Sequence, residues 1–167
     1  MRTKISLSII VLFLCFTKFA FSEGIEVRPS ESVKFSDILV HVGDNVSSFD
    51  LGNILVKKEL NNGYTIVKYV NGFISQYSPD GRIAFIGLYL KSDKILFFKG
   101  RQFKVQNRAM VEKVLGQPSS TVPVTSKDLY PESVELCIYA KDGVSFQYDL
   151  SGKITAVLIF NPSLFGN

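Results

Sequence analysis

The chain has 167 residues, a formal net charge of +4, 46% hydrophobic residues, two cysteines and one histidine. So few histidines and cysteines exclude the clustered ligands of a zinc site. No GxGxxG, GxxxxGK[ST] or GxSxG sequence is present to hold a nucleotide or a catalytic serine. We therefore expect no cofactor, no metal and no enzyme activity.

Residues 1–22 have the three parts of a secretory signal peptide. Arg2 and Lys4 form a positive start, residues 5–16 are largely apolar, and Ala20-Phe21-Ser22 supplies small residues for cleavage. The apolar run is short for a bilayer span, which makes an uncleaved anchor the lesser alternative. We expect a periplasmic or secreted chain beginning at Glu23. Removing the three basic residues of the leader leaves 16 basic against 15 acidic residues, a net +1, which predicts no nucleic-acid surface.

The first half of the mature chain predicts a lead-in, a short helix and a series of strands. Residues 23–32 are polar and predict a flexible lead-in. The apolar spacing of Val33 to Val42 predicts a short helix, with Ser32 as its cap and Gly43 as its end. A strand is the alternative prediction, because the segment is rich in β-branched residues. A loop over 43–52 follows, and we expect strands over 54–60, 64–70, 73–77, 83–90 and 94–98.

The second half predicts one helix, one long loop and a meander. Asn107 to Leu115 is the clearest helix, because Asn107 can cap it and Gly116 can end it. Ser119 to Ser133 predicts a polar loop. Val134 to Phe160 predicts three antiparallel strands that turn first at Asp142-Gly143.

Two stretches of the chain resemble one another. Val67 to Ile86 and Ile138 to Val157 align without gaps, and the identities are Gly72, Gln76, Tyr77, Gly81 and Ile83, which recur as Gly143, Gln147, Tyr148, Gly152 and Ile154. Shared turn chemistry explains the glycines but not the matched Gln-Tyr pairs, so the pattern favours duplication. We expect an α+β fold over 33–167, a single domain of two related units (about 33–98 and 99–160). Each unit is a helix plus an antiparallel meander, joined in one antiparallel sheet with the helices on one face.

The region 107–160 resembles a unit found in small exported bacterial proteins. Its marks are Val111, Leu115-Gly116 and Pro118, followed by a meander with Tyr139, Gly143, Tyr148 and Gly152. The unit occurs in the small outer-membrane assembly lipoprotein family and, as tandem copies, in the β-lactamase inhibitory proteins. This chain lacks the lipidated N-terminal cysteine of the assembly family. The resemblance implies a module that binds other proteins and carries no chemistry.

Tyrosines are the candidate contact residues. Tyr130, beside Pro131 in the predicted polar loop, is expected to be exposed, and Asp128 would add a charge at the same place. Tyr77 and Tyr148 are matched between the copies and are either equivalent core positions or a paired platform for a partner. Cys137 lies in an apolar strand and is expected to be a small buried residue.

These features predict an exported, non-enzymatic protein that binds another exported protein, as an inhibitor or immunity-type protein. A small-ligand or lipid carrier is an alternative, in which Phe73, Phe85, Phe97 and Phe146 would line a cavity. An envelope assembly accessory protein is another. An enzyme that uses only carboxylates would need a cleft with adjacent Asp and Glu side chains of raised pKa.

Overall fold

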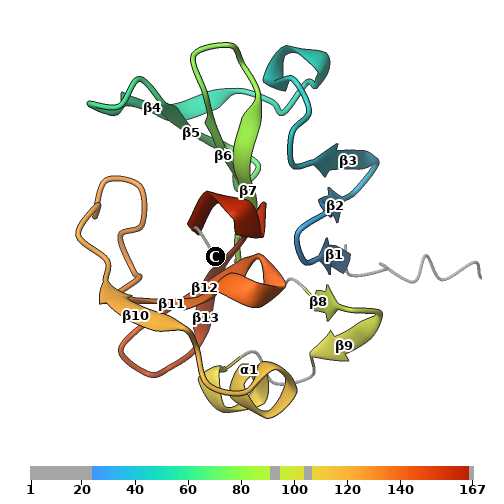
Figure 1. The fold of residues 1–167 in the computed structure, drawn as a ribbon, viewed down its shortest axis with the longest axis vertical. Helices are drawn as coiled ribbons and strands as arrows, with labels where there is room; N and C mark the ends of the chain where they lie inside the picture. The colour runs from blue at the N-terminus through green and yellow to red at the C-terminus, as the bar shows by residue number, and fades with distance from the viewer. Residues whose placement is uncertain (1–23, 91–94, 104–106, 166–167) are drawn as a thin grey trace, which may run out of the picture.

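The computed structural model describes residues 24–90, 95–103 and 107–165. In these residues the chain forms two β-sheets of five and eight strands, one α-helix and three short 3-10 helices (Figure 1). The predicted signal peptide lies outside the described residues. No helix among the described residues is both long and apolar enough to cross a membrane.

The five-stranded sheet has the order β3-β2-β1-β8-β9. Its strands are β1 (Gly24–Arg28), β2 (Ser32–Phe35), β3 (Ile38–His41), β8 (Ile95–Phe98) and β9 (Arg101–Phe103). Strand β1 pairs antiparallel with β2 and parallel with β8, so the first of the described strands is the central one of this sheet.

The eight-stranded sheet is antiparallel throughout and has the order β10-β11-β12-β13-β7-β6-β5-β4. Its strands are β4 (Ile54–Glu59), β5 (Thr65–Tyr69), β6 (Phe73–Tyr77), β7 (Ile83–Tyr89), β10 (Ser120–Pro123), β11 (Glu135–Tyr139), β12 (Val144–Tyr148) and β13 (Ile154–Phe160). The helices are α1 (Arg108–Leu115), η1 (Val46–Ser48), η2 (Ala140–Asp142) and η3 (Pro162–Phe165).

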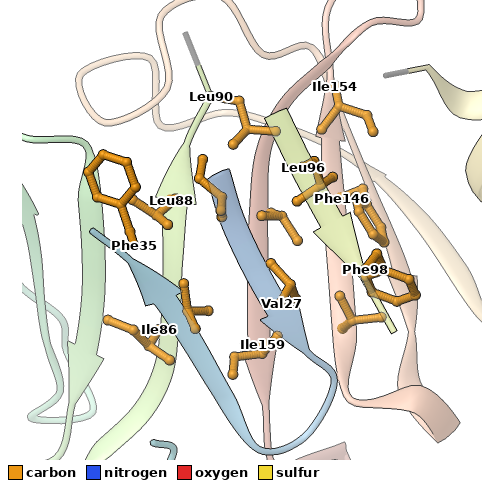
Figure 2. Close-up of a cluster of buried hydrophobic side chains, with 14 of the residues drawn as sticks. Val27, Phe35, Ile86, Leu88, Leu90, Leu96, Phe98, Phe146, Ile154 and Ile159 are labelled. Atoms are coloured by element: carbon orange, nitrogen blue, oxygen red, sulfur yellow. The ribbon is translucent and has the colours of Figure 1, made fainter. Parts of the chain in front are cut away.

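The two sheets pack face to face around one apolar core. Figure 2 shows side chains of β1, β2 and β8 lying over those of β7, β12 and β13. Val27, Ile86 and Ile159 are fully buried there, and the Phe98 and Phe146 rings lie 5.6 Å apart. Burying one such side chain stabilises the fold by roughly 1.5–3 kcal/mol. Cys137, buried as expected, is a free thiol, so this core rather than a disulfide holds the described fold together.

The halves of the eight-stranded sheet are built alike. The β6–β7 pairing shifts register between Gln76 and Tyr77, and the β12–β13 pairing shifts between Gln147 and Tyr148. The halves meet at the β7–β13 pair, where Gly87 lies opposite Leu158, its own counterpart in the aligned second copy. The register of the β7–β13 pair is therefore the same whether it is counted from the first half or from the second half of the sheet.

The similarity continues before each meander. Asn45 caps η1 and Asn107 caps α1. The residue after each asparagine bonds to a turn glycine of its own meander: the Val46 N–H donates to the Gly81 carbonyl at 2.9 Å, and the Arg108 N–H donates to the Gly152 carbonyl at 3.0 Å. Helix η1 is thus the one-turn counterpart of α1. We call residues 32–89 the first unit and residues 95–160 the second unit.

The β2–β3 and β8–β9 hairpins also correspond. Phe35 pairs with Ile38 in the first, and Phe98 pairs with Arg101 at the same position of the second. The two turns contain Ser36 at φ 54° and Lys99 at φ 49°, so each is closed by a residue in the left-handed region. Among the described residues of the second unit, no strand corresponds to β1.

The gap-free alignment of the two units is wrong ahead of their hairpin turns. Val67 pairs with Ser75, whose aligned counterpart Phe146 pairs with Cys137 and not with Ile138, the residue that the alignment matches to Val67. The cause is the second turn, which contains η2 and is one residue longer. The strand before it is therefore displaced, and Tyr69 corresponds to Tyr139.

The predicted fold class is wrong. The described chain is mostly β, and one α-helix beside two packed sheets replaces the expected row of helices on a single sheet. The helix expected over 33–42 is the β2–β3 hairpin. Its β-branched Val33 and Val40 pair across the strands and are both fully buried. Stiff branched side chains suit such a sheet better than a helix.

Two predicted irregular segments contain strands. The expected flexible lead-in over 23–32 holds β1, because Ile25 and Val27 alternate into the core. The expected loop over 119–133 begins with β10. In contrast, the helix after Asn107 is confirmed: the Asn107 Oδ1 accepts the Met110 N–H at 3.0 Å, and Gly116 ends the helix at φ 80°.

Candidate protein-binding surface

An exposed apolar group lies at one edge of the eight-stranded sheet. Strand β4 is the last strand of this sheet and pairs only with β5. Ile54 and Leu55 at its start are 57% and 58% exposed, and Val70 at the end of β5 is 57% exposed. Val70 lies beside them because its N–H donates to the Asn53 carbonyl at 2.9 Å. We call Ile54, Leu55 and Val70 the edge patch.

The surrounding turns fix the edge patch in place. Asn71 donates from Nδ2 to the Leu51 carbonyl at 2.9 Å and accepts the Phe73 N–H at 3.1 Å. Leu51 is buried in the core, so this asparagine ties the approach to β4 to the β5–β6 turn. A register shift between Ile54 and Val56 places Leu55 in a bulge. Bulges redirect the side chains of a strand.

A long loop of the second unit reaches the opposite edge of the same sheet. Residues 124–134, which we call the strap, connect β10 to β11 (Figure 1). Asp128 of the strap forms an ion pair with Lys58 of β4 at 3.7 Å, and the Leu129 carbonyl accepts the Lys68 ammonium of β5 at 2.8 Å. The strap therefore crosses the outer face of the sheet from β10 to β4.

A second, smaller apolar cluster lies under the strap. Leu129 and Tyr130 are buried there against Ile74, Ala156 and Leu158 of the sheet. In the first unit, the corresponding connection from β4 to β5 is much shorter and spans only 60–64. The covered outer face is thus a feature that the second unit adds.

The expectation that Tyr130 is exposed is wrong. Its side chain is 8% exposed, because the strap folds inward and the ring packs under it. Burial raises the pKa of Tyr130 to about 12, although a hydrogen bond from Gln147 works in the opposite direction. Asp128 is exposed as expected and faces Lys58.

Tyr77 and Tyr148 occupy equivalent positions against the core and form no exposed platform. Tyr148 is fully buried, and Tyr77 is partly buried and packs on the same cluster. Burial raises the pKa of the Tyr148 hydroxyl far above its ordinary value. The four candidate residues therefore do not meet at one surface: Tyr130 and Asp128 share the strap, while the other two point into the sandwich.

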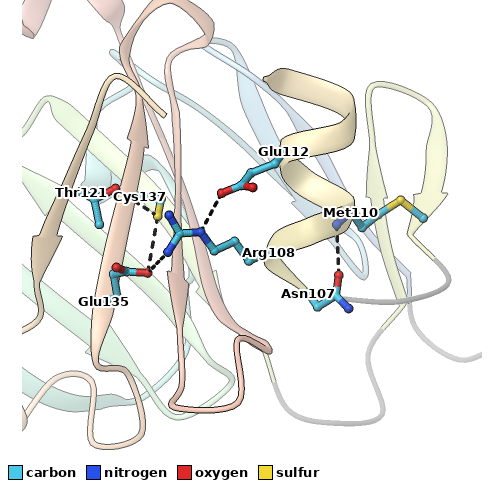
Figure 3. Close-up of polar contacts among 7 residues, drawn as sticks. All are labelled: Asn107, Arg108, Met110, Glu112, Thr121, Glu135 and Cys137. Atoms are coloured by element: carbon cyan, nitrogen blue, oxygen red, sulfur yellow. Dashed lines mark hydrogen bonds and ion pairs between the residues drawn. The ribbon is translucent and has the colours of Figure 1, made fainter. Parts of the chain in front are cut away.

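A polar cluster lies between α1 and β11 (Figure 3). The Arg108 guanidinium donates to Glu112 at 2.7 Å and to Glu135 at 2.6 Å. The Cys137 thiol lies 3.6 Å from the Thr121 hydroxyl. Among the described residues, only the second unit has this cluster. The equivalent positions of the first unit hold other residues: Val46 for Arg108, Thr65 for Glu135, Lys57 for Thr121 and Val67 for Cys137.

The thiol in this cluster is protected rather than activated. Cys137 is fully buried, and burial raises its pKa, against smaller opposing contributions from Thr121 and Arg108. A reactive cysteine needs a lowered pKa and access to solvent. The arrangement is that of a structural residue.

Two acidic side chains line a cavity on the surface of the second unit. Glu132, Asp149 and Lys153 line a surface cavity of about 460 Å³ beside Tyr89. Hydrogen bonds from Ser151 lower the pKa of Asp149, whereas a general acid needs a raised one. Among the described residues, no three His, Cys, Asp or Glu side chains come close enough to hold a metal ion.

The four phenylalanines expected around a carrier cavity are dispersed. Phe73 and Phe146 are fully buried in the main core. Phe85 packs against Phe160 on the outer face, with the ring centroids 5.4 Å apart. Phe97 lies on the outer side of the five-stranded sheet, beside Gly24.

Sequence reasoning missed the edge patch and its lysines. The sequence predicts the strand over 54–60 but not its exposure, because an edge strand has no mark of its own among its residues. A signal is nevertheless present: Ile54-Leu55-Val56 lacks the alternation of a half-buried strand and is followed at once by Lys57-Lys58.

Comparison with known proteins adds no relative: no family model, no curated protein and no solved structure matches this chain.

Proposed function

We propose that this protein is an exported, non-enzymatic binding module that holds another protein by adding an extended segment of that partner to strand β4. The observation that supports the proposal most strongly is the edge patch on an open strand. Strand addition of this kind takes its affinity from backbone hydrogen bonds and its specificity from alternate side chains. An inhibitory or immunity-type role is the form of binding that the sequence favours.

Strand β4 is the best suited of the edge strands. In the described sheets, the other strands at the edges are β3 with four residues, β9 with three and β10 with four, whereas β4 has six. Strand β10 also ends in Pro123, which lacks an N–H to donate. Short strands and prolines protect edges against pairing, and β4 has neither; its own protection consists of two lysines and the bulge at Leu55, which follow or interrupt the apolar start of the strand.

The charges on β4 favour a foreign partner over a second copy of the chain. Lys57 and Lys58 follow the edge patch and are about half exposed, at 51% and 47%. Two copies paired antiparallel through β4 would bring these lysines close together, and like charges across a strand pair are unfavourable. An aliphatic segment with acidic residues beside the lysines would match both halves of the strand.

Within the part of the chain that the structure describes, the other exposed apolar residues offer no comparable surface. Leu39, Val114, Val122 and Leu150 lie on β3, α1, β10 and the turn after β12, so they belong to four separate elements. Leu150 is the most exposed, at 91%. It provides a matched control for Leu55.

Affinity capture with two leucine variants tests this function. The tagged mature chain from Glu23, its Leu55→Lys variant and its Leu150→Lys variant are each passed over the exported fraction of the source cells. We expect one protein to be held by the wild type and by Leu150→Lys, and to be lost with Leu55→Lys. A partner held equally by all three would place binding elsewhere and contradict the proposal.

A further inference from the structure

The strap and the edge patch belong to different units, yet they meet on one strand. Strand β4 carries the exposed Ile54 and Leu55 at its start and Lys58 further along, and Lys58 is the residue that Asp128 of the strap contacts. The acid that pairs with the proposed docking strand is therefore supplied by the chain itself.

The geometry of β4 places Lys58 on the face that the strap covers. Lys58 pairs with Ile66 and Val56 pairs with Lys68, so these four positions share the outer face. Val56 and Ile66 pack at the margin of the cluster under the strap. A strand added to β4 would place every second side chain on this same face. A side chain opposite Lys58 would then lie where Asp128 lies now.

The contact of the strap with β4 is weak, in contrast to its packing on β6 and β13, where Leu129 and Tyr130 are buried. Its ion pair with Lys58 spans 3.7 Å between side chains that are about half exposed, so solvent screens it. Beneath the strap, Gln147 is 3% exposed, and within the described structure its Oε1 has no hydrogen-bond partner. A buried polar atom without a partner is unfavourable, so the face beneath the strap is incompletely satisfied at β12, while the contact with β4 rests on the half-exposed pair of Asp128 and Lys58.

We infer that the strap is an internal competitor for the docking strand, and that the partner's segment is aliphatic and acidic, with one carboxylate replacing Asp128 at Lys58. This inference rests on the proposed function, because it presupposes that β4 is the docking strand. Partner binding and release of the strap from β4 are then coupled. A segment with basic residues at these positions could not replace Asp128 at Lys58, so its binding would not be coupled to release of the strap.

Peptide binding to the full mature chain tests the inference. The probe is an eight-residue peptide of alternating leucine and aspartate, and its control alternates leucine and lysine. The protein variants are Asp128→Asn, which removes the competing acid, and Asp142→Asn, which removes the same charge from a remote pair with Lys99 at 2.8 Å. We expect Asp128→Asn to bind the acidic peptide at least about threefold more tightly than the wild type, and Asp142→Asn to match the wild type.

Each of the other possible results overturns a stated part of the inference. If Asp128→Asn and the wild type bind the acidic peptide equally, and Leu55→Lys abolishes both, the competitor role is overturned while the docking strand stands. If the basic peptide binds as well as the acidic one, the acidic character of the partner is overturned. If the acidic peptide fails to bind Asp128→Asn, or binds Leu55→Lys unchanged, the docking strand itself is wrong and the inference falls with it.

Discussion

The two units share a frame and differ in what is attached to it. Both have a hairpin, an asparagine-capped helix and a four-stranded meander, with the same register shift before the last strand. The first unit keeps a one-turn helix, a short β4–β5 connection and an exposed edge patch. The second has the longer α1, the strap and the Arg108 cluster. The differences lie where elements end or connect, and the frame itself is unchanged.

This contrast separates residues that build the fold from residues that are free to serve binding. The repeated positions are those that close turns, cap helices or fill the space between the sheets. The start of β10 differs from the start of β4: Lys57 pairs with Val67 as Thr121 pairs with Cys137, and the residues before Thr121 are Ser119 and Ser120, where β4 has Ile54 and Leu55 before Val56. An apolar surface that only one unit exposes is not needed by the shared frame. This is why we assign it to binding.

The greatest loss of stability is expected from disrupting the symmetric centre of the sheet. A Cβ added at Gly87 would overlap the Val157 carbonyl oxygen and lie 2.9 Å from the Leu158 Cα, and backbone atoms in a central ladder cannot move aside. We expect Gly87→Ala to lower the free energy of unfolding by about 3 kcal/mol or more. Urea denaturation measures this change.

Gly152→Ala in a turn of the second unit is the matched control. A Cβ there meets no atom within 4 Å, so only the φ of 78° opposes it. We expect a loss of about 1 kcal/mol. Equal losses at the two glycines would contradict the close packing of β7 against β13.

Installing the first unit's residues in the second tests how far the two units are interchangeable. Arg108→Val leaves the carboxylates of Glu112 and Glu135 without their cation, and we expect it to cost about 1–2 kcal/mol of stability. Arg108→Val combined with Glu135→Thr copies the first unit and is expected to recover at least half of that loss. The free energies of unfolding of both variants decide this. A double variant less stable than the single one would show that the two sites are not interchangeable.

The burial of Tyr130 under the strap makes the stability of the fold depend on pH in the alkaline range. Burial raises the pKa of Tyr130 from 10.0 to about 12 in the folded chain. The unfolded chain therefore releases this proton first. Stability from this group is complete below pH 10 and is lost between about pH 10 and 12, at up to about 1.4 kcal/mol per pH unit.

Tyr130→Phe removes this contribution. We expect its free energy of unfolding to fall less steeply than that of the wild type between pH 10 and 11, when both are unfolded by urea. The remaining slope comes from other tyrosines, such as the partly buried Tyr89 and the buried Tyr139, whose pKa values burial also raises to about 12. Identical slopes in the two proteins would contradict the burial of Tyr130 under the strap.

The free cysteine should matter least to stability. Cys137→Val installs the residue that the first unit has at Val67, of similar size and apolar character, and we expect a change of less than about 1 kcal/mol. A thiol reagent should react with wild-type Cys137 only after urea is added, because the side chain is fully buried. Rapid reaction of the folded chain would show that the cluster around Cys137 opens.

Local signals in the sequence predict the parts of the fold that they determine. Asn71-Gly72, Asn107 and the apolar run over 154–160 correctly indicate a hairpin, a helix start and a central strand. Val33 to Val42 is ambiguous, because the same apolar spacing suits a short helix or a hairpin. The hairpin is favoured by the left-handed turn at Ser36 and by burial of the segment against β7. Neither feature is encoded by a local sequence pattern.

The candidate site is less predictable than the fold. Tyr130 lies in a polar stretch, and its burial depends on contacts with Ile74 of β6 and with β13, which are distant from it in the sequence. The exposure of Leu55 depends on β4 being the last strand of its sheet. Both are properties of strand order, which is set by packing between distant segments, and the local sequence offers at most the missing alternation of Ile54-Leu55-Val56.

Amide hydrogen exchange of β4 is the decisive test of strand addition at the edge patch. The mature chain is measured alone and saturated with the alternating leucine–aspartate peptide, or with the captured partner. We expect new protection of amides within Ile54–Glu59, with no change in Ser120–Pro123 of the corresponding strand β10. Protection that appears in β10, or anywhere except β4 and its neighbours, would contradict the proposed mode of binding.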